Sequence, residues 1–195
     1  MHMNTIQIII IIVFTLAMIF YVLHLLITKF TPHLIAFGIW FVADFVNLLT
    51  YVKFSKFGIA PAIMSLGSAI ILTIGIIKRK KFHREILKTS DLICIFLVII
   101  SLLIWAITRN AVWSNMIIQI IIALGFVPIF DNVIHKKPEP LFPWFLFLIG
   151  WIITCIYTLN GYESIVELIY PFVNGLLGCL IIFIGSWIVI RRRMA

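Results

Sequence analysis

Long runs of hydrophobic residues separated by short polar segments dominate the pattern along the chain. Seven runs are long enough to form membrane-spanning helices, because a helix needs about 20 apolar residues to cross the hydrocarbon core of a bilayer. They lie at 5–28, 33–52, 57–77, 91–108, 111–130, 141–159 and 165–190. Their apolarity is continuous and does not alternate, which excludes a transmembrane β-barrel. The pattern therefore predicts an all-α membrane protein with seven transmembrane helices.

The order of residues in the first part of the chain recurs about 111 positions later. Pro32 and Trp40 correspond to Pro143 and Trp151, and each Trp follows its Pro by eight positions. The same order continues through further pairs: Pro61 with Pro171, Gly67 with Gly178, and the basic runs 78–81 with 191–193. Upstream, the pair Asn4 and Gln7 matches Asn115 and Gln119 after one inserted residue. Recurrence of several residue types in one order indicates an internal repeat.

Each copy of the repeat contains three predicted spans, and the span at 91–108 lies between the copies. A unit of three spans that starts outside must end inside, so one more crossing has to return the chain before the second copy begins. The prediction is a 3+1+3 arrangement, with a first three-helix repeat at 1–81, a basic loop and linker helix at 82–110, and a second repeat at 111–195. Such repeats are parallel, and a binding site is expected between them near the midplane.

Composition and charge fit a membrane protein and exclude an ordinary soluble domain. Hydrophobic residues make up 64% of the chain and charged residues only 11%, against about 25% charged in soluble domains. If the spans alternate, twelve Lys and Arg residues share the side of the C-terminus, and three lie on the other side: Lys53, Lys56 and Arg109. The positive-inside rule then places the C-terminus in the cytoplasm and the N-terminus outside.

The net charge of +8 is explained by basic residues at the membrane edges, so no nucleic-acid partner is expected. Binding of anionic lipid by the basic loops is an alternative use of the same charges. Short loops and Ile-rich spans suggest a bacterial inner membrane. The three cysteines, Cys94, Cys155 and Cys179, all fall inside spans without metal-ligand spacing, and no metal or cofactor is expected.

The most informative polar residues lie in the second predicted span. Asp44 is the only acid well inside any predicted span, and a carboxylate in lipid is costly enough that it should face a partner, a cavity or a proton path. Trp40 precedes Asp44 by four residues and Asn47 follows it by three, so the three side chains share one helix face. The alternative is that Asp44 and Asn47 only join helices by hydrogen bonds.

Polar residues in the second repeat complete the candidate site. Asn115 and Gln119 are four residues apart on one face of the fifth span. At about 1.5 Å per residue, Asp44, Gln119, Trp151 and Asn174 all lie roughly 12–14 Å below the outer ends of their helices. We therefore expect them to share a level near the midplane. Three prolines inside or near the spans are candidate hinges: Pro61, Pro128 and Pro171.

The 3+1+3 plan, the external N-terminus, Pro143 with Trp151, and the segment from Tyr170-Pro171 to Asn174-Gly175 resemble the SWEET and PQ-loop transporter superfamily. The resemblance covers nearly the whole chain, although the Pro-Gln dipeptide is absent and its nearest trace is Gly125 to Pro128. It implies a carrier of small polar solutes, sugar-like above all, in which Asn174 contacts the solute and Trp151 covers it. Nicotinamide-riboside-type vitamin facilitators are similar in helix plan and stay open as relatives.

The sequence thus predicts a solute carrier that works by alternating access, with the bilayer as its main partner and a homo-oligomer possible. Trp40 and Trp151 would stack on the solute, and Asp44 would take up a proton or select a cation. The amides that would hydrogen-bond the solute are Asn47, Asn115, Gln119 and Asn174. A non-transporting receptor or a structural scaffold on the same fold remains an alternative. An enzyme is not expected, because the spans offer one well-buried acid and no nucleophile beside a base.

Overall fold

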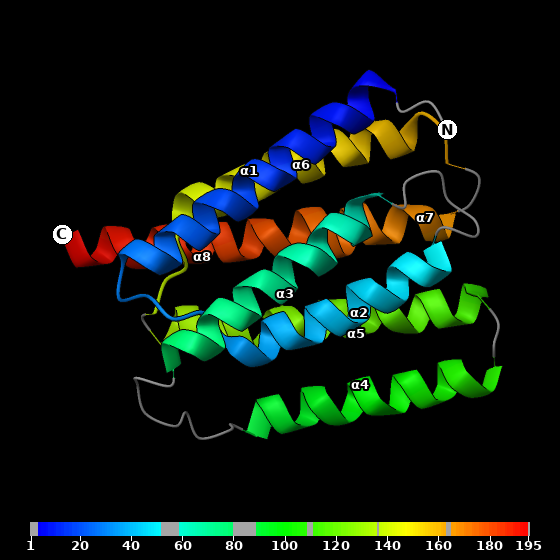
Figure 1. The fold of residues 1–195 in the computed structure, drawn as a ribbon, viewed down its shortest axis with the longest axis horizontal. Coiled ribbons are helices and arrows are strands. Elements are labelled where there is room, and N and C mark those ends of the chain that lie inside the picture. The colour runs from blue at the N-terminus through cyan, green and yellow to red at the C-terminus, as the bar shows by residue number, and fades with distance from the viewer. Residues whose placement is uncertain are drawn as a thin grey trace.

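The computed structural model describes residues 4–51, 59–79, 89–108, 111–135, 137–162 and 165–194, and these ranges form helices joined by short segments. The first six helices are α1 (Thr5–Ile27), α2 (Leu34–Tyr51), α3 (Ile59–Arg79), α4 (Thr89–Thr108), α5 (Ala111–Ile134) and α6 (Leu141–Leu159). The last three elements follow one another without a break: α7 (Ile165–Ile169), the π-helix η1 (Tyr170–Leu177) and α8 (Gly178–Met194). Counted as one rod, they give seven helices in the described part of the chain, as predicted (Figure 1).

The helices are those of a multi-pass membrane protein. Among the described residues, five helical stretches are long and apolar enough to cross a membrane: Thr5–Ile27, Ala60–Lys78, Met116–Ile134, Leu141–Leu159 and Glu167–Met194. Two shorter apolar stretches lie in α2 and α4, at Leu34–Leu48 and Ile95–Thr108. Large side chains such as Ile120 and Leu66 are more than 60% exposed. Such exposure suits a surface that contacts lipid tails.

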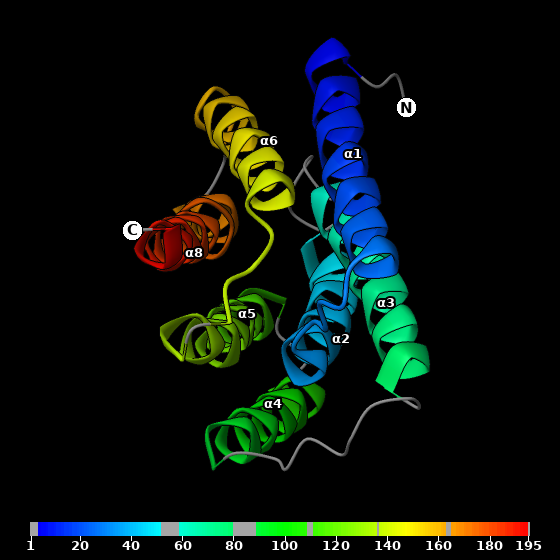
Figure 2. The same ribbon diagram turned by 90° about the vertical axis from the view of Figure 1, so that its left-hand side faces the viewer.

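Two groups of three helices make up most of the bundle. In the first group α3 packs against both α1 and α2, and in the second group α8 packs against both α5 and α6. The groups meet along two helix pairs, α1 with α6 and α2 with α5. Viewed from the end, α4 lies outside both groups, beside α5 and close to α2 (Figure 2). The interface between the groups therefore runs through the centre of the molecule.

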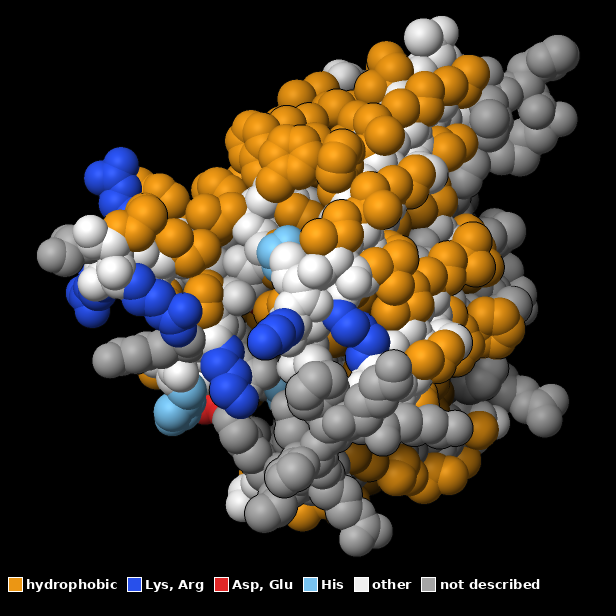
Figure 3. Space-filling model, turned by 60° about the vertical axis from the view of Figure 1, so that its left-hand side comes forward, with side chains coloured by type: hydrophobic (Ala, Val, Ile, Leu, Met, Phe, Trp, Pro, Cys, Tyr) orange, Lys and Arg blue, Asp and Glu red, His pale blue; other side chains and the backbone are white. Residues whose placement is uncertain are grey.

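The described Lys and Arg side chains gather at one end of the bundle, called here the basic end (Figure 3). It carries the C-terminal ends of α1, α3, α5 and α8. The Lys78 ammonium donates hydrogen bonds to the carbonyls of Leu25 and Thr28, the latter at 2.8 Å, and so satisfies carbonyls that the end of α1 leaves open. Lys53, Lys56, Arg109 and residues 80–88 lie outside the described residues.

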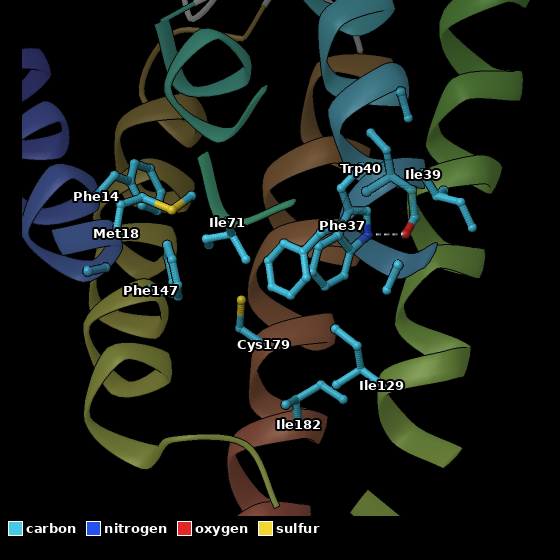
Figure 4. Close-up of a cluster of buried hydrophobic side chains, with 14 of the residues drawn as sticks. Phe14, Met18, Phe37, Ile39, Trp40, Ile71, Ile129, Phe147, Cys179 and Ile182 are labelled. Atoms are coloured by element: carbon cyan, nitrogen blue, oxygen red, sulfur yellow. Dashed lines mark hydrogen bonds between the residues drawn. The ribbon is translucent and has the colours of Figure 1, made fainter. Parts of the chain in front are cut away.

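Aromatic and aliphatic side chains from both helix groups form one core. Phe14, Phe37, Trp40 and Phe147 are each no more than 6% exposed. Figure 4 shows their rings, together with Ile71 and Cys179, pointing toward the space between the two groups. The indole Nε1 of Trp40 donates to the carbonyl of Ile122 at 3.0 Å, which ties α2 to α5 across the interface (Figure 4).

Candidate functional site

A small cavity lies at the centre of this core. Its walls come from α1, α2, α3, α5, α6, η1 and α8, so both helix groups contribute and α4 does not. The polar side chains in the wall include Asp44, Ser68 and Asn174, and the aromatic ones include Trp40 and Trp151. The free volume is only about 30 Å³, which holds water but falls far below the roughly 300–1,000 Å³ of a ligand pocket. The structure therefore leaves no room for a solute at its centre.

Asp44 enters the cavity wall from α2 and is paired across the interface. Its side chain is 3% exposed, and its Oδ1 accepts a hydrogen bond from the Tyr170 hydroxyl at 3.0 Å. Tyr170 is the first residue of η1, so this bond joins the two helix groups. A carboxylate can accept about four hydrogen bonds. Asp44 thus keeps acceptor capacity at the cavity beyond the bond from Tyr170.

Three buried amides form a hydrogen-bonded chain beside the cavity. Asn174 Nδ2 donates to Gln119 Oε1 at 2.6 Å and to the Gln119 carbonyl at 3.0 Å. Gln119 Nε2 in turn donates to Asn47 Oδ1 at 3.2 Å. The chain therefore connects η1, α5 and α2, and it uses residues from both helix groups.

The other end of the Asn174 amide is different. Its Oδ1 is buried and has no hydrogen-bond partner within the described ranges, although Asn174 lines the cavity. A buried acceptor without a donor costs about 1–3 kcal/mol. Asn174, a residue of the cavity wall, thus carries a buried acceptor that has no donor among the described residues.

Trp40 and Trp151, one from each helix group, pack in similar ways in the cavity wall. The rings of Trp40 and Phe126 are 4.7 Å apart and inclined by 59°, and those of Trp151 and Phe14 are 4.9 Å apart and inclined by 62°. Each tryptophan also lies against a glycine, Gly125 for Trp40 and Gly175 for Trp151. A Cβ atom at either glycine would overlap the indole ring. These glycines are therefore what allows the rings to approach the backbone.

The π-helix η1 carries Tyr170 and Asn174 into the site. It spans eight residues, with Pro171 at its second position and Gly175 at its sixth. Pro171 has no N–H to donate, and π-helical turns are rare outside functional sites. Pro128 lies inside α5, whereas Pro61 is the third residue of α3, where a missing N–H interrupts no helical bond. The roles of all three as hinges stay predictions.

The structure brings most of the predicted site residues together. Trp40, Asp44, Trp151 and Asn174 line the cavity, and Asn47 and Gln119 belong to the amide chain beside it. Asn115 is in α5, but its side chain lies outside what the structure describes. In the described ranges no group of three His, Cys, Asp or Glu residues could hold a metal ion.

Glu139 is a buried acid that the sequence did not single out. Asp44 is the only acid well inside any predicted span, but Glu139, which lies between two spans, and Glu167, at the outer end of the last span, are each 2% exposed. Glu139 Oε2 accepts hydrogen bonds from the Tyr21 hydroxyl at 2.7 Å and from Trp144 Nε1 at 3.2 Å. Its backbone N–H donates to Ser186 Oγ at 3.0 Å. Prolines on both sides of Glu139 restrict the backbone there and are the signal that could have drawn attention to it.

Two Tyr–carboxylate pairs therefore cross the interface in opposite directions. Tyr170 of the second helix group donates to Asp44 of the first, and Tyr21 of the first donates to Glu139, which lies two residues before α6 of the second. Asp44 lies ten residues into α2 from Leu34, about 15 Å from the basic end. Glu139 lies at the basic end itself. The two groups are thus joined at two depths.

Glu139 makes the stability of the protein depend on pH. Burial raises the pKa of Glu139 to about 7 from 4.5, against the lowering effect of its bonds from Tyr21 and Trp144. Its contribution to stability is full below pH 4.5 and is lost as the pH rises through about 7, because the unfolded chain gives up its proton first. Over this range we expect the wild type to lose on the order of 3 kcal/mol more than Glu139→Gln. Unfolding of both proteins at several pH values measures the difference, and parallel curves would contradict it.

Comparison of the chain with protein-family models, with curated proteins and with solved structures gave no match in any of the three. The cavity, its hydrogen bonds and the helix packing are therefore what a proposed function has to explain. These findings establish a multi-pass helical membrane protein with a small central cavity, whose lining includes polar and aromatic side chains.

Proposed function

We propose that the protein is a carrier of a small polar solute that works by alternating access at the central cavity. The observation that carries this proposal is a cavity between two helix groups, lined by a carboxyl group, an amide and three tryptophans, with residues from both groups. Buried polar groups are expensive in a membrane protein and mark solute or ion pathways. A scaffold would have no use for an unsatisfied amide oxygen at its centre.

The proposal includes the 3+1+3 arrangement of two parallel repeats, with α4 as the linker helix. Helix packing supports it, since α3 and α8 take the same central position in their groups. The ring pairs support it as well. Phe14 and Trp40 precede Phe126 and Trp151 by 112 and 111 residues, and each Trp packs on the Phe of the other unit at nearly equal distance and inclination. The basic end would face the cytoplasm and the N-terminus the outside.

The groups in the cavity wall select the chemistry of the solute. Asp44 and the Asn174 Oδ1 are acceptors with unused capacity, so the solute should bring hydrogen-bond donors. The rings of Trp40 and Trp151 offer apolar faces for stacking. A sugar-like solute, with hydroxyl donors around an apolar ring face, fits both requirements. The alternative is a vitamin, nucleoside or amine, in which a cationic group would face Asp44 and an aromatic ring.

Alternating access requires that the two units separate at one end and then at the other, because the central cavity is too small for a solute. The Tyr170–Asp44 bond would hold the two helix groups together at the central cavity, and the Tyr21–Glu139 bond would hold them together at the basic end. Trp144 links the two levels, since it lines the cavity and also donates to Glu139. A solute that donates hydrogen bonds to Asp44 would compete with the Tyr170 hydroxyl and weaken the Tyr170–Asp44 bond. Pro171 in the π-helix η1 and Pro128 inside α5 are where these helices would bend.

Thermal unfolding of the purified protein with sugars, vitamins, nucleosides and amines is the first test. A bound solute raises the unfolding midpoint by mass action, and we expect one class to do so. Asn174→Ala removes the open acceptor and should abolish the shift. Asn160→Ala is the matched control, because Asn160 is exposed and bonds only locally, to the carbonyl of Ile156. A shift that both variants retain would place the solute outside the cavity and contradict the proposal.

A further inference from the structure

A second and larger cavity lies at the basic end and shares no lining residue with the central cavity. Its volume is about 390 Å³. Basic side chains reach it from three separate parts of the chain: Lys29 after α1, Lys137 after α5, and Arg193 near the end of α8. Thr31 and Asn132 add a hydroxyl and an amide to the lining. Positively charged side chains and neutral hydrogen-bond donors thus lie together in the lining of this cavity.

Glu139 also lines this cavity. Its hydrogen bonds to the core reduce the influence of its negative charge on the cavity. Two neutral donors, Tyr21 and Trp144, hold its Oε2, and both belong to helices of the buried core. Against this one acid the lining sets three basic side chains. The cavity therefore has an excess of positive charge even with Glu139 ionised.

Orientation in the membrane requires basic residues at this end but does not require them to surround a hollow. Arg191 and Arg192 serve orientation equally well from outside the cavity, where Arg191 lies over the Trp187 ring at 4.8 Å. Convergence of Lys29, Lys137 and Arg193 on one polar cavity is a different feature. Arg forms paired hydrogen bonds with phosphate oxygens, and Lys supplies a point charge.

We propose that the cavity at the basic end binds a phosphate group, held by Lys29, Lys137 and Arg193 with Thr31 and Asn132 as neutral donors. The cavity lies at the basic end of the bundle, and basic residues at the ends of membrane helices commonly meet anionic headgroups. The phosphate can therefore belong to an anionic lipid or to a soluble phosphate compound. The site is separate from the central cavity, and the proposal does not depend on the identity of the transported solute.

The test compares two double variants that each remove two positive charges from the same end. Lys137→Gln with Arg193→Gln changes the cavity lining, and Arg191→Gln with Arg192→Gln leaves it intact. All four side chains are exposed, so both variants should fold, and their unfolding midpoints in chloride verify this. Each protein is then unfolded in detergent with inorganic phosphate or with chloride at equal ionic strength. It is also unfolded in vesicles of phosphatidylglycerol or of phosphatidylcholine.

We expect phosphate, phosphatidylglycerol or both to raise the midpoint of the wild type and of the Arg191/Arg192 variant. The Lys137/Arg193 variant should need at least tenfold more phosphate, or a larger phosphatidylglycerol fraction, for the same shift. A response to inorganic phosphate identifies a soluble ligand, and a response to phosphatidylglycerol alone identifies a lipid headgroup. Equal loss in both double variants, or no response of the wild type to either probe, would overturn the proposal.

Discussion

Asp44→Asn is expected to lower solute affinity and transport by about 10- to 100-fold while leaving the protein as stable as before or more stable. The loss follows because one carboxyl oxygen becomes an NH2 donor that cannot accept from the solute, and a lost or unsatisfied hydrogen bond costs about 1–3 kcal/mol. The stability follows because Asn has nearly the shape of Asp and can bring no charge to a site that is only 3% exposed inside a membrane. The amide oxygen can still accept from Tyr170. Opposite effects on binding and on stability are the sign of a residue kept for function.

Asp131→Asn is the matched control for this change. Asp131 lies near the basic end, and 30% of its side chain is exposed. Its Oδ1 is 3.2 Å from His135 Nδ1. It does not line the central cavity, so affinity and transport should stay at the wild-type level. If Asp44→Asn transports normally and is merely more or less stable, Asp44 only joins helices and the site loses its central residue.

Gly175→Ala is expected to destabilise the protein by about 1–3 kcal/mol, the usual cost of an extra methyl group in a packed core. The new Cβ would overlap the six-membered ring of Trp151. The Trp151 ring cannot move freely, because the rings of Phe14 and Tyr170 pack against it, with centroids 4.9 and 5.2 Å away. Displacement of Trp151 should also remove solute binding, so both the unfolding midpoint and the solute-induced shift should fall.

Gly38→Ala separates this packing effect from the general effect of adding a methyl group to a helix. A Cβ at Gly38 meets no atom within 4 Å, and Ala is favoured over Gly in helices by up to about 1 kcal/mol. Gly38→Ala should therefore be neutral or slightly stabilising. Equal midpoints for the two variants would show that Trp151 does not rest on Gly175 in the folded protein.

The helices could be predicted from the sequence because each is a long apolar run, and the bilayer requires such runs to be helical. The predicted span at 33–52 and the helix Leu34–Tyr51, for example, agree within one residue at each end. The predicted meeting of Asp44, Trp151 and Asn174 rested on depth along the helices, and these residues do line one cavity. Depth is readable from the sequence because helices have a fixed rise.

The partners of the buried acids could not be predicted in the same way. Tyr21 lies in an apolar run where a phenol ring looks like any other hydrophobic residue, and Glu139 lies in a short loop that looks solvated. Their bond joins residues 118 positions apart, so only the packing of α1 on α6 reveals it. The π-helical form of Tyr170–Leu177 is equally hidden, because Pro and Gly also occur in ordinary kinked helices.

Solute counterflow in sealed vesicles tests the central claim most directly. Vesicles containing the reconstituted protein are loaded with the solute that stabilises it, and uptake of labelled solute is followed in wild type, Trp151→Ala and Trp113→Ala. Trp113 is 60% exposed and serves as the matched control. We expect rapid counterflow in the wild type and in Trp113→Ala, and none in folded Trp151→Ala. Binding without counterflow in the wild type would contradict a carrier and favour a receptor on the same fold.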